Sequence, residues 1–371
     1  MKVLITGAFG FVGTNLSAYL AAKGHDLWAL DVESGLTEMQ RAQSAYRKFF
    51  HWGGLDNIPW NEVDAVVHLA GKAHDTRNAS DPQSYLDINV GLTKKVIVKF
   101  SRQDAKAQRK FILFSSVKAV ADRVEGVLTE DAVPNPQTAY GKSKLEAEGV
   151  VRSSFVWEGV SALVDETEPG GRRPEGGESV GNRQSAIGTD STHGLTHSWT
   201  HALLSYILRP CMIHGPGNRG NLNLLYGVVR KGIPWPLGAF ENRRSFASIG
   251  NVCAVVEGLL TKEAPAGVYQ VADDETLSTN ELIGLMARSL GKRPRIWRVP
   301  AGVIRWAARC GDLLGLPLNS ERLKKLTESY VASNAKIKAA LGWTSMPIRA
   351  EEGMRETLES FSRKGAKSPR N

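Results

Sequence analysis

Three side chains in the first half of the chain could together move a proton and a hydride. Tyr140 and Lys144 are four residues apart, which places both on one face of a helix. A tyrosine with its ordinary pKa of about 10 is a poor base, but a neighbouring ammonium group lowers that pKa. Ser116 ends an apolar run 24 residues before Tyr140. Alone, such a Tyr–Lys pair is commonly a surface feature; with the serine and a nucleotide site, it predicts redox chemistry at an alcohol.

A glycine-rich turn near the N-terminus supplies that nucleotide site. Gly7, Gly10 and Gly13 follow an apolar run and open a helical pattern. They permit a tight turn, close approach of a diphosphate and packing of the helix on the strand, respectively. The diphosphate is then expected at a helix N-terminus, where backbone N–H groups favour negative charge. Asp31, 18 residues after Gly13, can accept hydrogen bonds from both ribose hydroxyls, which favours NAD over NADP.

Strand-like and helix-like segments alternate around these residues. Strands are expected at residues 2–6, 25–31, 65–69, 110–115 and 203–208, and helices at 11–23, 82–100 and 139–151. The strands are continuous apolar runs, which is typical of a parallel sheet covered on both faces. We therefore predict an α/β fold, a Rossmann-type doubly wound parallel sheet with a smaller α/β C-terminal substrate lobe.

The expected division of the chain follows from where this pattern stops. Residues 1–216 are predicted to form the NAD-binding domain, and residues 217–371 mainly the substrate-binding lobe, with part of 248–275 returning to the sheet. Residues 165–200 contain seven glycines and little apolar periodicity, so a flexible insertion is expected over 158–201. His193, His197 and His201 are spaced by four within it, which we interpret as coincidence, and no metal site is predicted.

Composition excludes several classes of protein. With 371 residues, 42% of them hydrophobic and 23% charged, the chain is expected to be a soluble globular protein of about two domains. Three scattered cysteines and the lack of a long apolar run favour the cytoplasm. The formal charge is +9, and residues 292–371 hold 17 Lys and Arg against seven Asp and Glu. A basic lobe suits a phosphorylated ligand, a nucleic acid or an acidic membrane, although a plain solvated surface explains it too.

These motifs resemble the extended short-chain dehydrogenase/reductase superfamily, in its NAD-dependent epimerase/dehydratase branch. The resemblance implies Ser116, Tyr140 and Lys144 as catalytic residues. It implies cofactor contacts along the glycine turn, the end of the 65–69 strand and the next helix, namely Gly7, Gly10, Phe11, Val12, Gly13, Asp31, Leu69, Ala70, Gly71, Asn89, Tyr140 and Lys144. It implies substrate contacts from Ser116, Asn221, Leu222 and Arg244, with Asn221 and Arg244 at the diphosphate.

One local string separates the activities within that branch. Sugar 4,6-dehydratases of the family carry an Asp–Glu pair directly after the catalytic Ser or Thr, where this chain has Val117 and Lys118. Elimination of water is therefore not expected. The string resembles bacterial surface-polysaccharide (O-antigen type) 4-epimerases and 4-reductases. A UDP-glucose or UDP-N-acetylglucosamine 4-epimerase is the first expectation, an NAD(P)H-dependent 4-keto-6-deoxy sugar reductase the second, and a non-catalytic nucleotide-binding protein the third.

The expected partners follow from the same reading. They are a nucleoside diphosphate sugar, with UDP-sugars favoured, and a second copy of the chain in a homodimer; no nucleic acid is expected. Residues 301–318 have apolar spacing interleaved with Arg305 and Arg309, which predicts either a core helix or a weak membrane-surface helix. Three features depart from the family pattern. His214 stands where tyrosine is common, and Gly54-Leu55 replaces the pair that usually contacts adenine near a strand expected at 51–55. The insertion also places Arg209 69 residues after Tyr140, where family members have far fewer residues.

Overall fold

A computed structural model describes residues 1–32, 44–72, 81–101, 108–154, 203–218, 220–314 and 319–366. The predicted insertion at 158–201, with its three histidines, lies outside these residues. Among the described residues, no helix is long and apolar enough to cross a bilayer.

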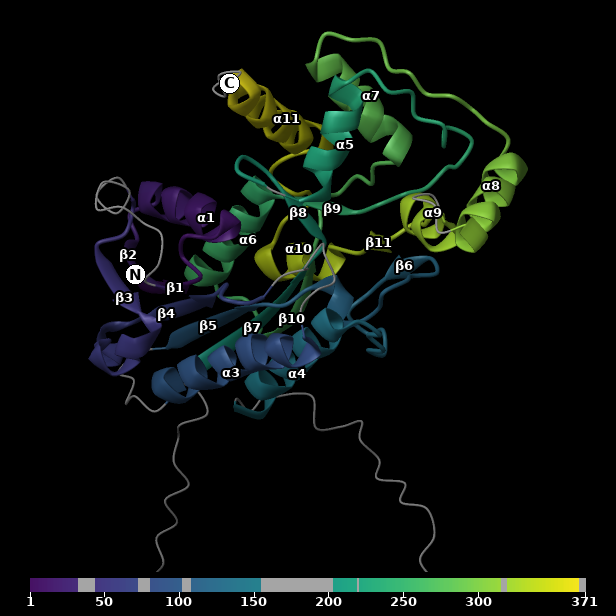
Figure 1. Ribbon diagram of the computed structural model, residues 1–371. Coiled ribbons are helices and arrows are strands. Elements are labelled where there is room, and N and C mark those ends of the chain that lie inside the picture. Colours follow the sequence, from purple (N-terminus) through teal and green to yellow (C-terminus); the bar gives the residue numbers. More distant parts are fainter. Residues whose placement is uncertain are drawn as a thin grey trace, which may run out of the picture.

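Seven parallel strands form the central sheet (Figure 1). They are β1 (Lys2–Thr6), β2 (Asp26–Asp31), β3 (Lys48–His51), β4 (Ala65–His68), β5 (Arg109–Phe114), β7 (Leu203–Pro210) and β10 (Gly267–Val271), in the order β10-β7-β5-β4-β1-β2-β3. This is the predicted doubly wound α/β sheet. The order changes direction between β1 and β4, the point at which sheets of this kind bind their ligands.

Alternate side chains of each strand enter the two layers that cover the sheet. In β1, Val3 and Ile5 pack on one face and Leu4 on the other. The first face is covered by α1 (Phe11–Ala22), α6 (Ile249–Thr261) and α10 (Ala335–Leu341), and the second by α3 (Pro82–Ser101) and α4 (Ala139–Ser154). Because both faces of the inner strands are buried, most of their positions are apolar, which explains their hydrophobic runs.

The second lobe is built mainly from helices around its own core. It contains α5 (Asn221–Arg230), α7 (Thr279–Ser289), α8 (Ala301–Leu314), α9 (Ser320–Thr327) and α11 (Ala350–Ala366), with the short parallel pair β8 (Met212–His214) and β9 (Phe246–Ser248). The short strands β6 (Val127–Leu128) and β11 (Val331–Ala332) pair with each other and so connect the two lobes.

The structure differs from the expected elements in three places. The β7 strand continues through Arg209 and Pro210, because both pair with β10. The β3 strand ends at His51, and residues 52–57 form a 3-10 turn, η1 (Trp52–Asn57), instead of a strand near 51–55. The short helix α10, which sequence spacing alone assigned to the second lobe, places Ile337 and Leu341 in the core of the sheet.

Candidate active site

The glycine-rich turn joins β1 to α1, and its backbone leaves no room for side chains. Gly7 has φ +64°, and a Cβ there would lie 2.9 Å from the Ala70 backbone nitrogen. A Cβ on Gly13 would lie 2.4 Å from the Ala8 carbonyl oxygen. Gly10 caps α1 without a side-chain hydrogen bond. The first-turn N–H groups of α1 have no side-chain cap and are available to an anion such as a dinucleotide diphosphate.

Two side chains fix this turn from outside. The Asp31 carboxylate, at the end of β2, accepts hydrogen bonds from the backbone N–H of Phe9 and of Val32, each at 2.8 Å. The buried Tyr46 hydroxyl donates to the Ala8 carbonyl at 3.0 Å and to the Gly13 carbonyl at 3.2 Å. Sequence spacing did not find Tyr46, because its partners lie more than thirty residues away. Phe11 and Val12, at the start of α1, are partly buried against the core of the sheet.

Tyr140, Lys144 and Ser116 meet at the carboxyl edge of the sheet. Ser116 follows β5 and begins a short turn, η3 (Val117–Ala119), where its Oγ accepts from the Lys118 backbone N–H. Tyr140 and Lys144 lie one turn apart on α4. The buried Lys144 ammonium donates to the Phe114 carbonyl at 2.9 Å, two residues before Ser116. Thus a hydroxyl, a phenol and an ammonium converge from two elements.

The charge states of the pair are set chiefly by burial. Burial raises the pKa of Tyr140, while its hydrogen bond with Ser116 lowers that pKa. Nearby Tyr85 raises it further, and the expected lowering by the Lys144 ammonium is not among the effects that shift this pKa. Burial lowers the pKa of Lys144 to about 8, and the Glu148 carboxylate raises it. A positive group bound beside the phenol would oppose the effect of burial on Tyr140.

The segment after β4 packs directly against Lys144. A Cβ on Gly71 would lie 2.7 Å from Asn89 Oδ1 and 3.0 Å from Lys144 Nζ. Asn89 on α3 accepts from the Lys72 N–H at 2.7 Å and donates to Ser143 Oγ on α4 at 2.8 Å. Leu69 packs on the sheet core, and Ala70 N–H donates to Thr6 Oγ1 at 3.0 Å. Asn89 therefore holds the turn that contains Gly71 against the helix that contains the catalytic pair.

A buried ion pair between Glu148 on α4 and Arg209 on β7 fixes α4 to the sheet. Glu148 is the third member of the four-residue series begun by Tyr140 and Lys144. Its carboxylate accepts from Ser115 Oγ at 2.6 Å and from Arg209 Nε and Nη2 at 2.9 and 2.6 Å. Arg209 on β7 and Glu148 are both almost fully buried. This clamp fixes α4 to the residue next to Ser116, and the continued helical spacing was the signal that could have found it.

The second lobe touches the site through the residues after Ser116. The Tyr330 hydroxyl donates to the carbonyls of Val117 and Ala121 at 3.2 and 2.8 Å. The Lys118 ammonium donates to the Asp122 carbonyl at 2.8 Å and lies 4.3 Å from the centre of the Tyr330 ring. Burial lowers the pKa of Lys118, and nearby Arg244 lowers it further.

The expected substrate residues are not gathered as closely. Arg244 is partly buried, pairs with Leu277 in a bridge and donates through Nε to the Glu328 carbonyl at 3.2 Å. Burial lowers its pKa. Leu222 is only 3% exposed and packs in the core of the second lobe, so its side chain offers no surface to a substrate. The backbone of Asn221 begins α5, and its side chain lies outside the described structure.

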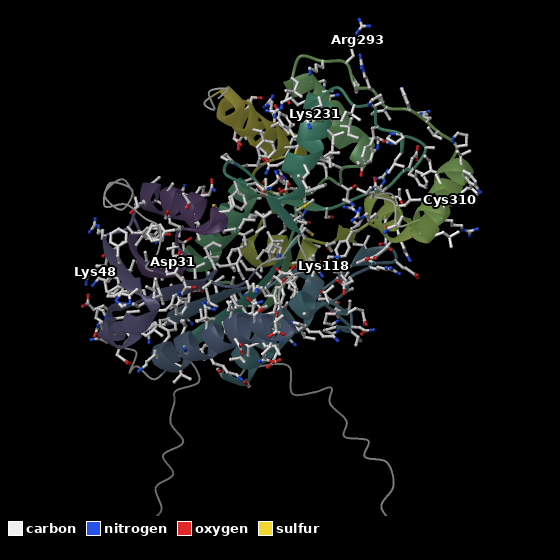
Figure 2. The ribbon with its side chains drawn as sticks, viewed as in Figure 1. Asp31, Lys48, Lys118, Lys231, Arg293 and Cys310 are labelled. Atoms are coloured by element: carbon white, nitrogen blue, oxygen red, sulfur yellow. The ribbon has the colours of Figure 1, made fainter. Side chains whose placement is uncertain are left out.

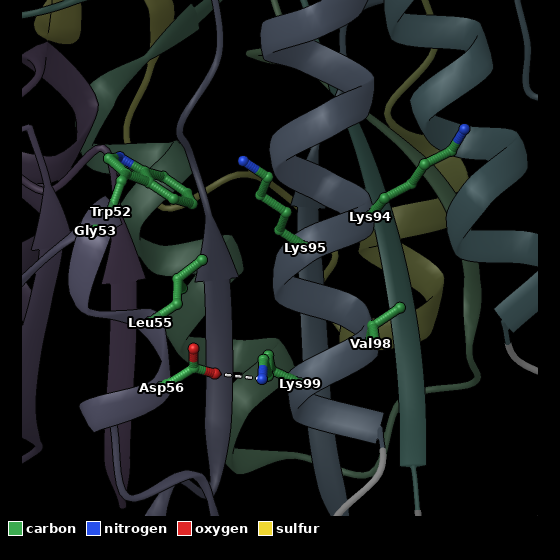
Figure 3. A pocket seen from close by; sticks show the side chains of 8 residues that line it. All are labelled: Trp52, Gly53, Leu55, Asp56, Lys94, Lys95, Val98 and Lys99. Carbon is green, nitrogen blue, oxygen red and sulfur yellow. Dashed lines mark hydrogen bonds and ion pairs between the residues drawn. The ribbon is translucent and has the colours of Figure 1, made fainter.

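A surface hollow of about 450 Å³ lies elsewhere, between η1 and the second half of α3 (Figure 3). Its lining includes Trp52, Lys94 and Lys95, and an ion pair between Asp56 and Lys99 closes one end. Leu55, beside the expected adenine contact, lines this hollow, but none of Ser116, Tyr140 and Lys144 does. We therefore place the chemistry at the strand ends and not in this hollow.

This geometry, with its glycine turn, Asp31 anchor and Ser–Tyr–Lys set, defines a dinucleotide-dependent enzyme of the short-chain dehydrogenase/reductase class. Residues 3–163 match the NAD dependent epimerase/dehydratase family. Over 97% of its length the chain is 28% identical to a UDP-glucose 4-epimerase from Vibrio cholerae, 95% of which is covered. Over 96% it is 25% identical to the N-acetyl-alpha-D-glucosaminyl-diphospho-ditrans,octacis-undecaprenol 4-epimerase of Escherichia coli O157:H7, 94% of which is covered.

Solved structures agree on the fold. A UDP-glucuronic acid 4-epimerase from Bacillus cereus, in complex with NAD, superposes with a TM-score of 0.65 at 18% identity, covering 98% of this chain and 99% of that one. The match of residues 3–163 is to the family that the motifs predicted, the NAD-dependent epimerase/dehydratase family, and it supports NAD as the cofactor.

Proposed function

We propose that this protein is a nucleotide-sugar 4-epimerase that acts on UDP-sugars such as UDP-glucose or UDP-N-acetylglucosamine, through a transient 4-keto sugar. One observation carries the proposal: Ser116 hydrogen-bonds the Tyr140 phenol while the Lys144 ammonium is held one helical turn away. The relatives from Vibrio cholerae and Escherichia coli support it, because both are named as 4-epimerases and this chain matches nearly the full length of each.

In this proposal each side chain has a separate task. Tyr140 removes the proton of the C4 hydroxyl and later returns a proton to the new C4 oxygen. Ser116 hydrogen-bonds that oxygen and holds it near the phenol. Lys144 keeps a positive charge beside the phenolate. Bound NAD supplies a hydride acceptor that is regenerated when hydride returns to the opposite face of C4. The cycle therefore consumes no reductant.

The residues after Ser116 favour this chemistry over elimination. Val117 is buried among apolar neighbours, and the Lys118 ammonium is engaged by a carbonyl and an aromatic ring. Neither can act as a carboxylic acid or a carboxylate base toward C5 and C6 of a sugar. A dehydratase activity would need both functions at these positions.

We also propose which parts of the chain bind the cofactor and which bind the substrate. Residues 1–216, with the returning segment within 248–275, would bind NAD, and the rest of residues 217–371 would bind the sugar nucleotide. Arg244 and Asn221 would contact the diphosphate, Arg244 through a planar guanidinium that matches phosphate oxygens. Its closeness to Lys118, which follows Ser116 by two residues, supports that role.

Assembly and location complete the proposal. We propose a cytoplasmic homodimer formed through the packed pair α3 and α4, whose outward positions include the unobstructed glycines Gly91 and Gly149. We also propose that the protein associates weakly with a membrane surface. Light scattering of the purified protein would report the dimer, and a monomer at all accessible concentrations would refute it.

Incubation with candidate substrates tests the reaction. The purified protein is mixed with UDP-glucose, UDP-N-acetylglucosamine or a 4-keto-6-deoxy sugar nucleotide, with and without NADH, and the products are separated by chromatography. We expect UDP-galactose or UDP-N-acetylgalactosamine to form without net oxidation or reduction. Stoichiometric loss of NADH with a 4-keto substrate would instead identify a reductase. Absence of any product, with NAD still bound, would favour a binding protein.

A further inference from the structure

The strongest feature outside the active site is an apolar stripe on α8. Val303, Trp306 and Leu313 are 54%, 68% and 87% exposed, and Cys310 is partly exposed between them. Their spacing of three, four and three residues places all four on one side of the helix. The opposite side anchors α8 to the second lobe, because Ile304 and Ala308 are buried beside Leu237 and Leu323. The stripe is therefore unpartnered within the described chain.

Positive charge surrounds this stripe. Residues 292–314 contain six Lys and Arg and one acid, Asp312. Arg305 and Arg309 are exposed and lie along one flank of the stripe. Exposed Arg293, Arg295 and Arg298 precede the helix together with Trp297, which is 59% exposed. An apolar stripe with tryptophan and flanking arginines is the pattern of a helix that lies in a membrane interface.

The position of α8 allows such contact. It forms the outer edge of the second lobe, far from β1 to β3 (Figure 1). Figure 2 shows Cys310 on this outer helix and Arg293 projecting from the loop that leads toward it. Ser116 and Tyr140 lie in the other lobe, so contact through α8 would not cover them.

We propose that the α8 stripe, Val303, Trp306, Cys310 and Leu313 with Arg305 and Arg309, docks on the surface of an anionic phospholipid bilayer. The charge of the segment selects the occupant, because six cations against the single acid Asp312 suit an anionic lipid surface better than a neutral protein partner. Trp306 and Leu313 enter the headgroup region, while the guanidinium groups contact lipid phosphates. This inference rests on the proposed membrane association and not on the proposed reaction, which is measured separately on soluble UDP-sugars.

Flotation of the full chain with vesicles tests the docking surface. We expect the protein to float with vesicles of phosphatidylethanolamine and phosphatidylglycerol, to stay behind with phosphatidylcholine alone, and to be released by salt. Leu313→Ser should weaken the apparent affinity by about tenfold, since it removes interfacial apolar area. Leu224→Ser is the matched control, because Leu224 is 71% exposed on α5, outside the stripe.

Two double variants test whether the arginines beside the stripe contribute to membrane binding. Replacing both Arg305 and Arg309 by Gln should weaken binding by on the order of tenfold or more. Replacing Lys94 and Lys95 by Gln removes the same charge from exposed positions on α3 and should change binding little. Equal losses for both double variants would show that net charge alone drives binding and would overturn the proposed surface.

Cys310 offers a second readout, because Cys211 and Cys253 are buried. A polarity-sensitive dye on Cys310 should shift its emission to the blue when anionic vesicles are added. A dye on Leu224→Cys in a Cys310→Ser background should not. A blue shift without lipid that grows with protein concentration would mean that a second copy covers the stripe and would refute the proposal. Epimerase activity on UDP-sugars serves as the folding control throughout, and its absence would count only against the proposed reaction.

Discussion

At the scale of single residues, the environment of the Tyr140 phenol opposes the role that we propose for it. Burial makes its proton harder to lose, yet the proposed reaction needs it to act as a base. The Ser116 hydrogen bond opposes the effect of burial, and a positive group bound beside the phenol would oppose it further. The sequence predicted this set because a serine and a Tyr–Lys pair at these spacings, together with a nucleotide-binding turn, indicate redox chemistry at an alcohol.

Replacing the phenol removes that function alone. We expect Tyr140→Phe to lower kcat by about a hundredfold to ten-thousandfold, because a positioned acid–base group contributes that range. NAD binding, followed by titration calorimetry, should persist. Tyr226→Phe is the control, since its hydroxyl only bonds Ser362 in the second lobe. Near-normal turnover by Tyr140→Phe would assign the proton transfer to another group.

Gly71 tests how tightly the lysine is held. In Gly71→Ala the new methyl group would meet both Asn89 Oδ1 and Lys144 Nζ, so the ammonium must move. We expect kcat to fall by on the order of tenfold to a hundredfold with little change in melting temperature. Gly227→Ala, on α5 with open space around its Cα, should leave both unchanged. A large loss of stability in Gly71→Ala with normal kcat would make the position structural only.

At the scale of elements, sequence periodicity was sufficient for the strands and helices around the glycine turn. Each of these strands is buried on both faces, so its pattern is unbroken. Periodicity was insufficient for α10 and for the end of β7. The assignment of α10 depends on Ile337 reaching a sheet more than sixty residues back along the chain. Helical spacing could have indicated Glu148 but not its partner Arg209, since the two residues are 61 positions apart in the chain.

That clamp makes a prediction for α4. The Glu148 carboxylate raises the pKa of Lys144 against burial, which lowers it to about 8. In Glu148→Gln the pKa of Lys144 should fall further, so the ammonium is lost at lower pH. The alkaline fall of kcat should therefore begin at a lower pH than in the wild type. The measurement is kcat against pH from neutral to about pH 10, across the range in which a lysine of this kind titrates.

A neighbouring carboxylate separates charge from structure in this test. Glu146→Gln alters an exposed residue of the same helix and should leave the alkaline limb in place. Glu148→Gln should also melt earlier, because Arg209 keeps a buried charge with a weaker partner. A lower melting temperature with an unmoved pH profile would mean that Glu148 acts only in folding.

At the scale of the whole molecule, a buried imidazole beneath the site is expected to contribute to the loss of stability in acid. His68 at the end of β4 is bonded to Thr6 Oγ1 at 2.8 Å and to Thr93 Oγ1 at 3.1 Å, which joins β1 to α3. Burial, followed by the charge of Lys144, lowers its pKa to about 3. An unfolded histidine titrates near pH 6.5, about three units higher.

The sign of the effect follows from this difference. Above about pH 6.5, His68 is neutral in both the folded and the unfolded protein, so its burial does not reduce the free energy of unfolding through protonation. As pH falls toward 3, His68 binds a proton in the unfolded chain but stays neutral in the folded protein. The free energy of unfolding therefore decreases. The slope from this group is at most about 1.4 kcal/mol per pH unit. Thermal melting across pH 7 to about pH 4 measures it, on top of the carboxylate contribution shared by all variants.

Substitution of the imidazole should flatten that decline. We expect His68→Gln to be less stable than the wild type at pH 7, because it loses a buried hydrogen bond, but to lose less further stability on acidification. His51→Gln, which changes an exposed histidine at the end of β3, should keep the wild-type slope. If His68→Gln and the wild type decline in parallel, protonation of His68 in the folded state must be far easier than its burial between β1 and α3 indicates.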